Sequence, residues 1–539
     1  METRRRHGAS LHGSVRPGPT VVETHVSVLV FLDDVVLKYK KPVRFPFLDF
    51  GTAEARRAAC EAEVEANRRL SPDVYLGVAD VVLGDRTLDH AVVMRRLPAD
   101  RSLAAQAQAH APDLDVQLAR LASVLADFHA KAARSPAIDA GGGADAVAET
   151  WRGCLDSLTA YAGPELAPTT VARVEDLALG FLAGRRALFD QRVTAGRVCD
   201  GHGDLLATDV FLLDDGPRVL DCVEFDPRLR HVDVIADVAF LAMDLERFGA
   251  PAAAATFLRL YEEMAGDLFP PSLVHHYCAQ RALVRAEVAC IRASQADGAA
   301  SGAPALLDLA LHHLEEGRVV LGVVCGAPGT GKSTVAAAVG ERLGWPVLRS
   351  DEVRRELVDP GAATAPLAPF GGEGYSPETT ERTYLTLLGR ARAALGLGQS
   401  VVLDATFTDR RWHDAAERLA DDTTSALVVV QCTAGLDVTV PRLRARRDSG
   451  ADVSGADEEV GRALVARARP WPVAVPVDTA HVPVHDSIEA ALAAFGRPAP
   501  APPGSGVDGR RTPGAPEGAP AGAPEGAPEG APEGARGPR

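Results

Sequence analysis

Apolar residues recur at every second position in the first part of the chain, which is the spacing of half-buried strands. Residues 21–98 contain this alternation, and one longer segment, Thr52–Leu70, has the spacing of an amphipathic helix instead. The predicted strands are Val26–Leu32, Val35–Tyr39 and His90–Met94. We therefore expect a sheet with one helix in this region.

The pattern of residues 99–318 is mostly helical, and a strand–loop–strand segment at 196–225 interrupts it. From Val319 onward, short continuous apolar runs alternate with helical segments, and a weaker run lies at 481–485. The stronger runs are 319–325, 346–350, 400–405 and 425–433. Such runs predict a parallel sheet covered by helices on both faces, so we expect an α/β protein of several domains.

The two ends of the chain lack any such periodicity. Residues 1–20 are rich in Gly, Arg and Pro, and residues 499–539 repeat G-A-P-E units after a Pro-rich segment. Both are expected to be disordered tails, because neither composition can form a core. Between them we predict an N-terminal lobe at 21–98, a helical lobe at 99–318 and a C-terminal α/β domain at 319–498.

The formal net charge of −16 argues against nucleic acid as the main partner, since phosphate neutralisation needs basic surface. The eight cysteines form no C-x-x-C pair, which suggests a reducing compartment. We find no signal peptide and no apolar run long enough for a membrane span, and expect a soluble cytoplasmic protein. Arginine dominates the basic residues, and lysine occurs only at 38, 40, 41, 131 and 332.

The segment after the run at 319–325 has the pattern G-x-x-x-x-G-K-S, and a helical run follows it. Its glycines let backbone N–H groups curl around phosphates, and the helix N-terminus adds a partial positive charge. Lys332 is expected to reach the β- and γ-phosphates of ATP, and the Ser333 hydroxyl to bind Mg²⁺. The expected ATP-binding residues are Gly326, Ala327, Pro328, Gly329, Thr330, Gly331, Lys332, Ser333 and Thr334.

Two aspartates come at the ends of later strands of the predicted parallel sheet. Ligands bind at the carboxyl ends of such strands, where Asp351 and Asp404 are expected to lie. We assign Asp351 to the catalytic base or substrate contact and Asp404 to the metal side, although these roles could be exchanged. Either residue could instead simply begin a helix after a strand.

An arginine-rich segment follows the fourth strand. Arg442 and Arg446 are four residues apart and share a helix face, so they could close over the nucleotide and stabilise charge on the transferring phosphoryl group. The alternative is a solvated basic face of the helix.

This region resembles small P-loop kinases of the gluconate-kinase, polynucleotide-kinase and zeta-toxin type. The likeness covers about 319–495 and rests on the phosphate loop, Ser350–Arg355, Val402–Phe407 and Gln431–Thr433 with the arginines after it. It implies a P-loop NTPase sandwich that uses ATP and Mg²⁺.

The earlier string H-G-D-L-L-A-T-D places carboxylates in a loop, and another follows on the next predicted strand, 218–225. In phosphoryl transfer Asp204 could accept the proton of the acceptor hydroxyl, and Asp209 and Asp221 could hold Mg²⁺. The other interpretation is ordinary turn chemistry, because aspartate is common in loops.

The same string resembles the H-G-D-x-x-x-x-N then D pattern of aminoglycoside phosphotransferases and choline kinases. That resemblance implies a bilobal, protein-kinase-like α+β fold, with 94–98 as the hinge between the lobes. It assigns Lys38 to the ATP phosphates, with Lys40 as its alternative, and Glu63 to the lysine's partner, with Glu61 or Glu65 as alternatives.

Across 21–495 the chain resembles bacterial fusions of an aminoglycoside phosphotransferase-like domain with a C-terminal P-loop kinase-like ATPase domain. It departs from the phosphotransferase pattern in having Asp209 where the metal-binding asparagine stands, and 23–27 in place of a Gly-rich loop. We expect an ATP-dependent phosphotransferase that acts on a small-molecule hydroxyl. The alternative is a P-loop ATPase switch with a non-catalytic sensor domain.

Overall fold

The computed structural model describes residues 20–24, 26–45, 48–161, 166–295, 302–358, 376–449 and 469–496. The predicted tails therefore lie outside the described residues, except Thr20, which begins the first strand. Over the described ranges, no helix combines the length and the apolar character needed to cross a bilayer.

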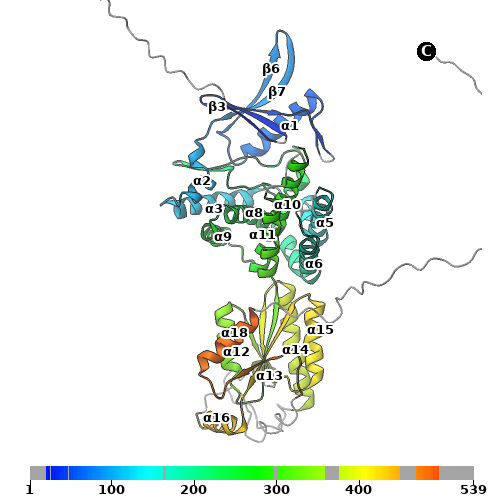
Figure 1. The fold of residues 1–539 in the computed structure, drawn as a ribbon, viewed down its shortest axis with the longest axis vertical. Helices are drawn as coiled ribbons and strands as arrows, with labels where there is room; N and C mark the ends of the chain where they lie inside the picture. The colour runs from blue at the N-terminus through cyan, green and yellow to red at the C-terminus, as the bar shows by residue number, and fades with distance from the viewer. Residues whose placement is uncertain are drawn as a thin grey trace, which may run out of the picture. The chain divides into compact units, whose positions relative to one another are not determined.

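A five-stranded antiparallel sheet forms the first part of the fold (Figure 1). The strand order is β1-β2-β3-β7-β6, and the strands predicted at 26–32, 35–39 and 90–94 are all present. The outer strands β1 and β6 were not predicted, because their apolar residues are largely exposed. The bounds are β1 (Thr20–Glu23), β2 (Ser27–Phe31), β3 (Val35–Lys40), β6 (Tyr75–Leu83) and β7 (Arg86–Arg95), with a separate hairpin of β4 (Arg44–Phe45) and β5 (Leu48–Asp49).

Helix α1 (Ala53–Arg68) packs on this sheet. The Thr52 hydroxyl accepts a hydrogen bond from the backbone N–H of Ala55 at 3.1 Å, so the helix begins where a side-chain cap is available. Its buried face brings Cys60 and Val64 against apolar residues of the strands, including Val92. The same face carries Glu63, which is therefore held inside the lobe.

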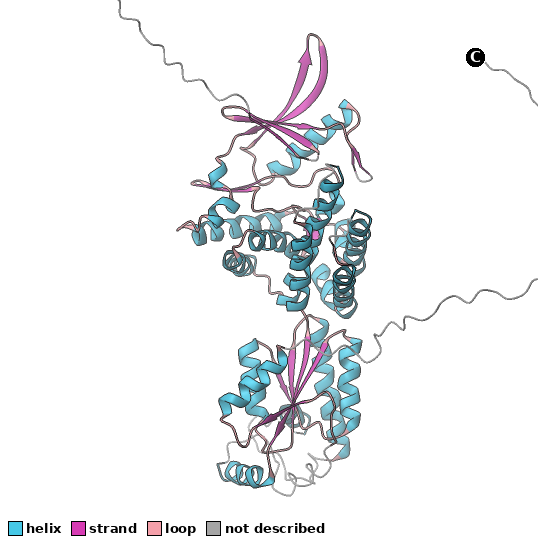
Figure 2. Ribbon diagram, in the orientation of Figure 1, coloured by secondary structure: helices cyan, strands magenta, loops and turns pink. Residues whose placement is uncertain are grey.

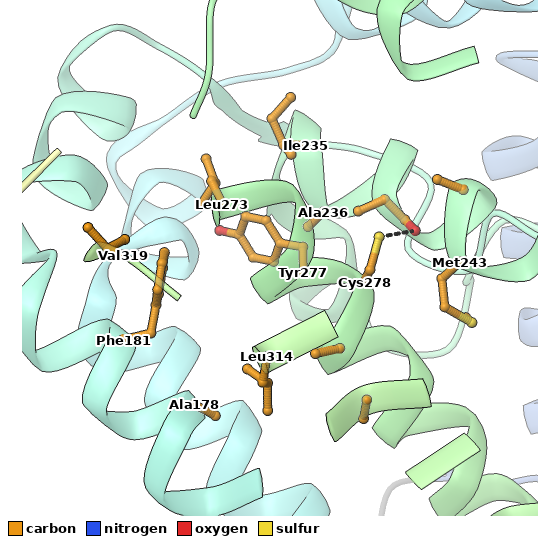
Figure 3. Packing of buried hydrophobic residues seen from close by; sticks show 14 of the residues in the cluster. Ala178, Phe181, Ile235, Ala236, Met243, Leu273, Tyr277, Cys278, Leu314 and Val319 are labelled. Carbon is orange, nitrogen blue, oxygen red and sulfur yellow. Dashed lines mark hydrogen bonds between the residues drawn. The ribbon is translucent and has the colours of Figure 1, made fainter. Parts of the chain in front are cut away.

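The following region is a set of packed helices, as predicted for 99–318. Helix α8 is its centre, because all residues from Val234 to Leu245 are buried and it packs on α9 and α10. Figure 3 shows part of this core, where Cys278 donates to the Ala239 carbonyl at 3.4 Å. The helices are α2 (Leu103–Gln108), α3 (Leu114–Lys131), α4 (Pro136–Asp139), α5 (Ala144–Tyr161), α6 (Pro168–Gly184), α7 (Arg186–Thr194), α8 (Val234–Arg247), α9 (Pro251–Ala265), α10 (Pro271–Gln295) and α11 (Ala303–Glu316).

Four short strands occupy the predicted interruption and its continuation. They are β8 (Val198–Asp200), β9 (Val210–Leu213), β10 (Gly216–Val219) and β11 (His231–Asp233), paired β9 with β10 and β8 with β11. The strand predicted at 218–225 was wrong beyond Val219. Asp221 instead has a left-handed backbone, with φ of 64°, which ends the extended run and turns its carboxylate toward Lys38.

The second sheet is parallel throughout, with strand order β13-β14-β12-β15-β16 (Figure 2). The prediction of an α/β sandwich is confirmed. Its strands are β12 (Val320–Cys325), β13 (Val347–Arg349), β14 (Val401–Asp404), β15 (Ala426–Thr433) and β16 (Val475–Asp478).

Helices cover both faces of this sheet. One face packs against α12 (Lys332–Leu343) and α18 (Val484–Phe495), through residues such as Val335 and Ala491. The other face packs against α13 (Ser350–Val358), α14 (Pro377–Gly396) and α15 (Arg410–Asp422). Helix α16 (Leu436–Ser449) follows β15.

The weaker strand predicted at 481–485 was wrong. Asp478 accepts backbone hydrogen bonds from Ala480 at 2.7 Å and His481 at 3.1 Å, which form a turn that leads into α18. The edge strand β16 precedes that turn. The domain boundaries predicted at 98 and 318 stay predictions.

Candidate functional site

The phosphate loop connects β12 to α12, as the motif predicted. Gly326, Gly329 and Gly331 have φ angles of 145°, 82° and 86°, which side chains other than glycine rarely adopt. A Cβ at Gly326 would lie 2.6 Å from the Cys432 carbonyl oxygen, and one at Gly329 would lie 2.9 Å from that of Thr439. The glycines therefore permit both the backbone path and its close approach to neighbouring segments.

Lys332 is the first residue of α12 and is only 8% exposed. Its ammonium has no hydrogen bond or ion pair to any described residue. A buried cation without a partner is costly, and an anion at the helix N-terminus would offset that cost. Ser333 follows it and is half-buried, whereas Thr334 is exposed. The loop thus fits the phosphates of ATP.

Asp404 ends β14 and is 3% exposed. Its Oδ2 accepts from Arg349 Nε at 3.1 Å, while Oδ1 has no hydrogen-bond partner among the described residues. Burial lowers the pKa of Arg349, but Asp404 and two further carboxylates together raise it above its ordinary value, so the guanidinium stays charged. The orphaned oxygen fits a role in the hydration shell of Mg²⁺.

Asp351 lies in the first turn of α13, two residues beyond the end of β13. It is half-buried and contributes, after Asp404 and Glu352, to the raised pKa of Arg349. A carboxylate in the first turn also stabilises the helix dipole. The structure therefore places Asp351 near Arg349 and keeps both of its predicted roles open.

Arg442 extends from α16 to the phosphate loop. Its Nη2 donates to the Thr479 carbonyl at 2.8 Å and its Nη1 to the Gly329 carbonyl at 3.4 Å. Thr479, which the sequence did not single out, donates in turn to the Thr330 carbonyl at 2.5 Å. Arg442 thus joins α16 to the loop backbone, and the side chain of Arg446 lies outside the described residues.

The second candidate site is a buried charge network on β3 and α1. Lys38 and Lys40 share one face of the strand, because side chains two apart point the same way. The Glu63 carboxylate lies 2.8 Å from Lys38 Nζ through Oε1 and 2.6 Å from Lys40 Nζ through Oε2. Glu61 and Glu65 are exposed, so of the three glutamates only Glu63 contacts the lysines.

Two carboxylates that follow β10 complete the network. Asp221 Oδ1 lies 2.5 Å from Lys38 Nζ, and Glu224 pairs with Lys40. Burial raises the pKa of Asp221, but the charge and hydrogen bond of Lys38 together with the charge of Lys40 bring it below its ordinary value, so the carboxyl stays ionised. Burial and then Glu63 raise the pKa of Glu224. The Lys40–Glu224 pair is a part of the network that sequence reasoning missed.

Asp204 and Asp209 lie on the loop beside Asp221. Burial is the main cause that raises the pKa of Asp204 to about 6, which is close to the value that suits a general base. Burial and then the charge of Asp221 raise the pKa of Asp209 well above its ordinary value. The structure thus brings Asp204, Asp209 and Asp221 together, as the sequence predicted.

The carboxylates can hold a cation only together with other ligands. No group of three or more His, Cys, Asp or Glu side chains could hold a metal ion within the described ranges. Mg²⁺ at nucleotide sites usually binds one or two carboxylates and the phosphates, so Asp209 and Asp221 fit that chemistry. A cation would also offset their mutual repulsion.

Helix α8 anchors the loop of Asp204 and Asp209 through two of its aspartates. Asp237 accepts from the backbone N–H groups of His202 at 2.6 Å and Gly203 at 2.9 Å, and Asp244 accepts from that of Ala207 at 2.9 Å. Both carboxylates are fully buried. Sequence reasoning missed them, although two aspartates seven residues apart in an otherwise apolar helix were a visible signal.

Comparison with known proteins gives matches to the C-terminal region and to most of the chain. The sequence profile of the AAA domain family matches residues 321–471, within the region predicted to bind nucleotide. The uncharacterized protein Rv2004c of Mycobacterium tuberculosis is 42% identical over 464 residues, which cover 85% of this chain and 92% of that protein.

Solved structures of kinases align with each half separately. A choline/ethanolamine kinase family protein from Mesorhizobium loti covers 57% of this chain and 90% of its own, with 14% identity and a TM-score of 0.35. A gluconokinase from Sinorhizobium meliloti covers 33% of this chain and 91% of its own, with 18% identity and a TM-score of 0.25.

Proposed function

We propose that this chain, which belongs to the same family as Rv2004c of Mycobacterium tuberculosis, is an ATP-dependent phosphotransferase acting on the hydroxyl of a small molecule. A second ATP site lies at its phosphate loop. The observation that carries the proposal is the Lys38–Glu63 ion pair, at 2.8 Å, beside the carboxylates of Asp204, Asp209 and Asp221. A domain that only bound nucleotide would use the lysine and the metal-binding carboxylates, but it would not need Asp204 as a base.

The N-terminal reaction follows from these positions. Lys38, held by Glu63, would contact the ATP phosphates, and Asp209 and Asp221 would hold Mg²⁺. Mg²⁺, when bound, neutralises charge on the phosphates. Asp204 would accept the proton of the acceptor hydroxyl while that oxygen attacks the γ-phosphate in line. The pKa of about 6 leaves Asp204 ionised at neutral pH yet basic enough to take the proton.

The P-loop site would bind a second ATP. Lys332 would contact its β- and γ-phosphates, Ser333 would bind Mg²⁺, and Asp404 would lie in the hydration shell of that ion. Asp351 is the proposed base, and Arg442 ties α16 to the loop that surrounds the phosphates. This half therefore hydrolyses ATP or transfers its phosphate.

A second candidate is an ATPase switch with a sensor half. Asp209 favours it, because a carboxylate where the related kinases have an asparagine adds repulsion with Asp221. In that case the N-terminal half would bind a small molecule or nucleotide without transferring phosphate, and the P-loop half would be the only one that turns over.

ADP formation by the full chain separates the two functions. We would compare the wild type, Lys332→Ala, Asp204→Asn and the double variant, with and without pooled hydroxyl compounds. Asp214→Asn, in the exposed β9–β10 turn, is the matched control for charge loss. Acceptor-dependent turnover that survives Lys332→Ala and disappears in Asp204→Asn supports the phosphotransferase. Acceptor-independent hydrolysis that only Lys332→Ala abolishes supports the switch, and activity unchanged in the double variant contradicts both.

A further inference from the structure

Helix α10 brings arginines to the loop that carries Asp204. Arg281 Nη1 lies 3.4 Å from the Gly203 carbonyl oxygen, and its Nε donates to the Ala236 carbonyl at 3.2 Å. The guanidinium also lies over the Phe240 ring, 4.9 Å from its centroid. Arg281 is therefore fixed against the residue that precedes the proposed base.

Arg285 and Arg292 continue the same side of the helix. They lie four and eleven residues after Arg281, and these spacings fall on one stripe of an α-helix. Arg285 is half-buried, and neither it nor Arg292 has a hydrogen bond or ion pair with a described side chain. Burial and then the charge of Arg285 lower the pKa of Arg292, so the two cations repel each other.

This stripe is unusual in an acidic protein. For comparison, buried Arg192 pairs with Asp233 and Asp267, and buried Arg185 donates to the backbone carbonyls of Thr423 and Thr424. Burial raises the pKa of Asp204, and Arg285 and then Arg281 lower it; Arg281 is also a minor contributor to the lowered pKa of Asp237. Asp204 cannot pair permanently with them if it is to accept a proton.

The charges around the loop also divide into two sets. Lys38 acts on Asp209 and Asp221, which are the carboxylates on the nucleotide side. Arg285 is the strongest charge acting on Asp204 itself. The arginine stripe thus acts on the proposed base, to which an acceptor hydroxyl must come.

We propose that the acceptor carries an anionic group, a phosphate or a carboxylate, which Arg285 binds with the support of Arg281 and Arg292. Guanidinium groups bind both anions through paired N–H donors. The same stripe would repel a polycationic acceptor such as an aminoglycoside. This inference rests on the proposed phosphotransferase function of the N-terminal half.

The first test compares acceptors that differ only in charge. The full chain with Lys332→Ala would be assayed with glucose, gluconate and glucose 6-phosphate, with glycerol and glycerol 3-phosphate, and with kanamycin. We expect the anionic member of a set to be turned over with at least tenfold higher kcat/KM than its neutral counterpart. A preference for the neutral compounds or for kanamycin would overturn the proposal.

The second test changes the arginine. Arg285→Ala should raise the KM of the anionic acceptor at least tenfold and leave the KM of ATP within about twofold, and Arg285→Lys should restore part of the loss. Arg259→Ala on α9 is the control, because Arg259 pairs with Glu263 on the exposed surface. An equal rise in the KM of ATP would show that Arg285 serves the nucleotide instead and would overturn the proposal.

Binding separates this inference from the proposed function. Glucose 6-phosphate, gluconate and glycerol 3-phosphate would be titrated by calorimetry into the Lys332→Ala chain saturated with Mg²⁺ and a non-hydrolysable ATP analogue. Anion binding that Arg285→Ala abolishes, without turnover, would keep the anion site and reject the phosphotransferase. Turnover of neutral acceptors without anion binding would keep the phosphotransferase and reject the anion site. The absence of both binding and turnover would overturn both proposals.

Discussion

The Glu63 carboxylate lies 2.8 Å from the Lys38 ammonium, and the glutamate side chain is fully buried. Its second oxygen lies 2.6 Å from Lys40. One carboxylate thus balances two buried ammonium groups, and each lysine has a further carboxylate partner in Asp221 or Glu224. Glu63 is the residue on which the geometry of the N-terminal site depends most directly.

Glu63→Gln should therefore destabilise the N-terminal lobe by about 3–5 kcal/mol, because it breaks two buried ion pairs at once and leaves each lysine with a single carboxylate partner. Acceptor-dependent ADP formation should fall at least 100-fold, while hydrolysis at the phosphate loop persists. Urea unfolding, monitored by far-UV circular dichroism, measures the loss of stability. The control is Glu61→Gln, whose exposed side chain pairs only with Arg57, and an equal effect of both variants would contradict the assigned role.

The rate of the N-terminal reaction should follow the ionisation of Asp204. Because the pKa of Asp204 is raised to about 6, the base is ionised above that pH and kcat/KM should fall about tenfold per pH unit below it. Assays of the Lys332→Ala chain between pH 5 and 8 would measure this. A profile without an inflection between about pH 5 and 7 would exclude Asp204 as the base.

The stability of the fold should depend on pH in the opposite direction to the rate. A raised pKa means that the folded state favours the protonated carboxyl, so Asp204 contributes stability below its ordinary pKa, and this contribution is lost as the pH rises through about 6. Asp204→Asn should thus gain stability relative to the wild type as the pH rises from about 4 to 7. Denaturation at both ends of that range tests the sign, and a fall in relative stability would contradict it.

Asp209→Asn should reduce the dependence of the fold on Mg²⁺. Asp221 raises the pKa of Asp209 by repulsion, and a bound cation or a neutral side chain would relieve it. Without Mg²⁺ the variant should melt roughly 2–4 °C above the wild type, and adding Mg²⁺ should stabilise the wild type more. Thermal melts with Mg²⁺ or EDTA measure both quantities. Asp215→Asn, in the exposed β9–β10 turn, should change neither.

Lys332→Met should stabilise the nucleotide-free protein and abolish its response to ATP at the phosphate loop. The ammonium is buried without a described partner, so an apolar side chain of similar length removes a desolvation cost of about 1 kcal/mol or more. MgATP at 100 times its Kd should stabilise a binding-competent loop by about 2.7 kcal/mol, and that contribution should disappear. Lys131→Met, which removes an exposed lysine paired with Asp127, is the control, and ATP stabilisation as large in Lys332→Met as in the wild type would refute the assigned contact.

The sequence by itself determined the parts of the fold that depend on local spacing. Continuous apolar runs predicted the parallel sheet, and alternation predicted β2, β3 and β7. The phosphate loop was predictable because its glycines, lysine and serine are consecutive, and their conformation depends mainly on their own backbone. The loop of Asp204 and Asp209 was recognisable for the same reason.

Only the tertiary structure decided which distant charges meet. The sequence left Glu61 and Glu65 as alternatives to Glu63, and packing of α1 on the sheet buries Glu63 alone of the three. Asp237 and Asp244 accept hydrogen bonds from the loop backbone because α8 packs against the loop. They lie too far from the loop in sequence for a local pattern to predict this contact. The position of the arginine stripe of α10 beside Asp204 likewise follows from helix packing and not from a local sequence pattern. Burial removes solvent screening, and so the fold, more than the spacing, determines the charge of each site.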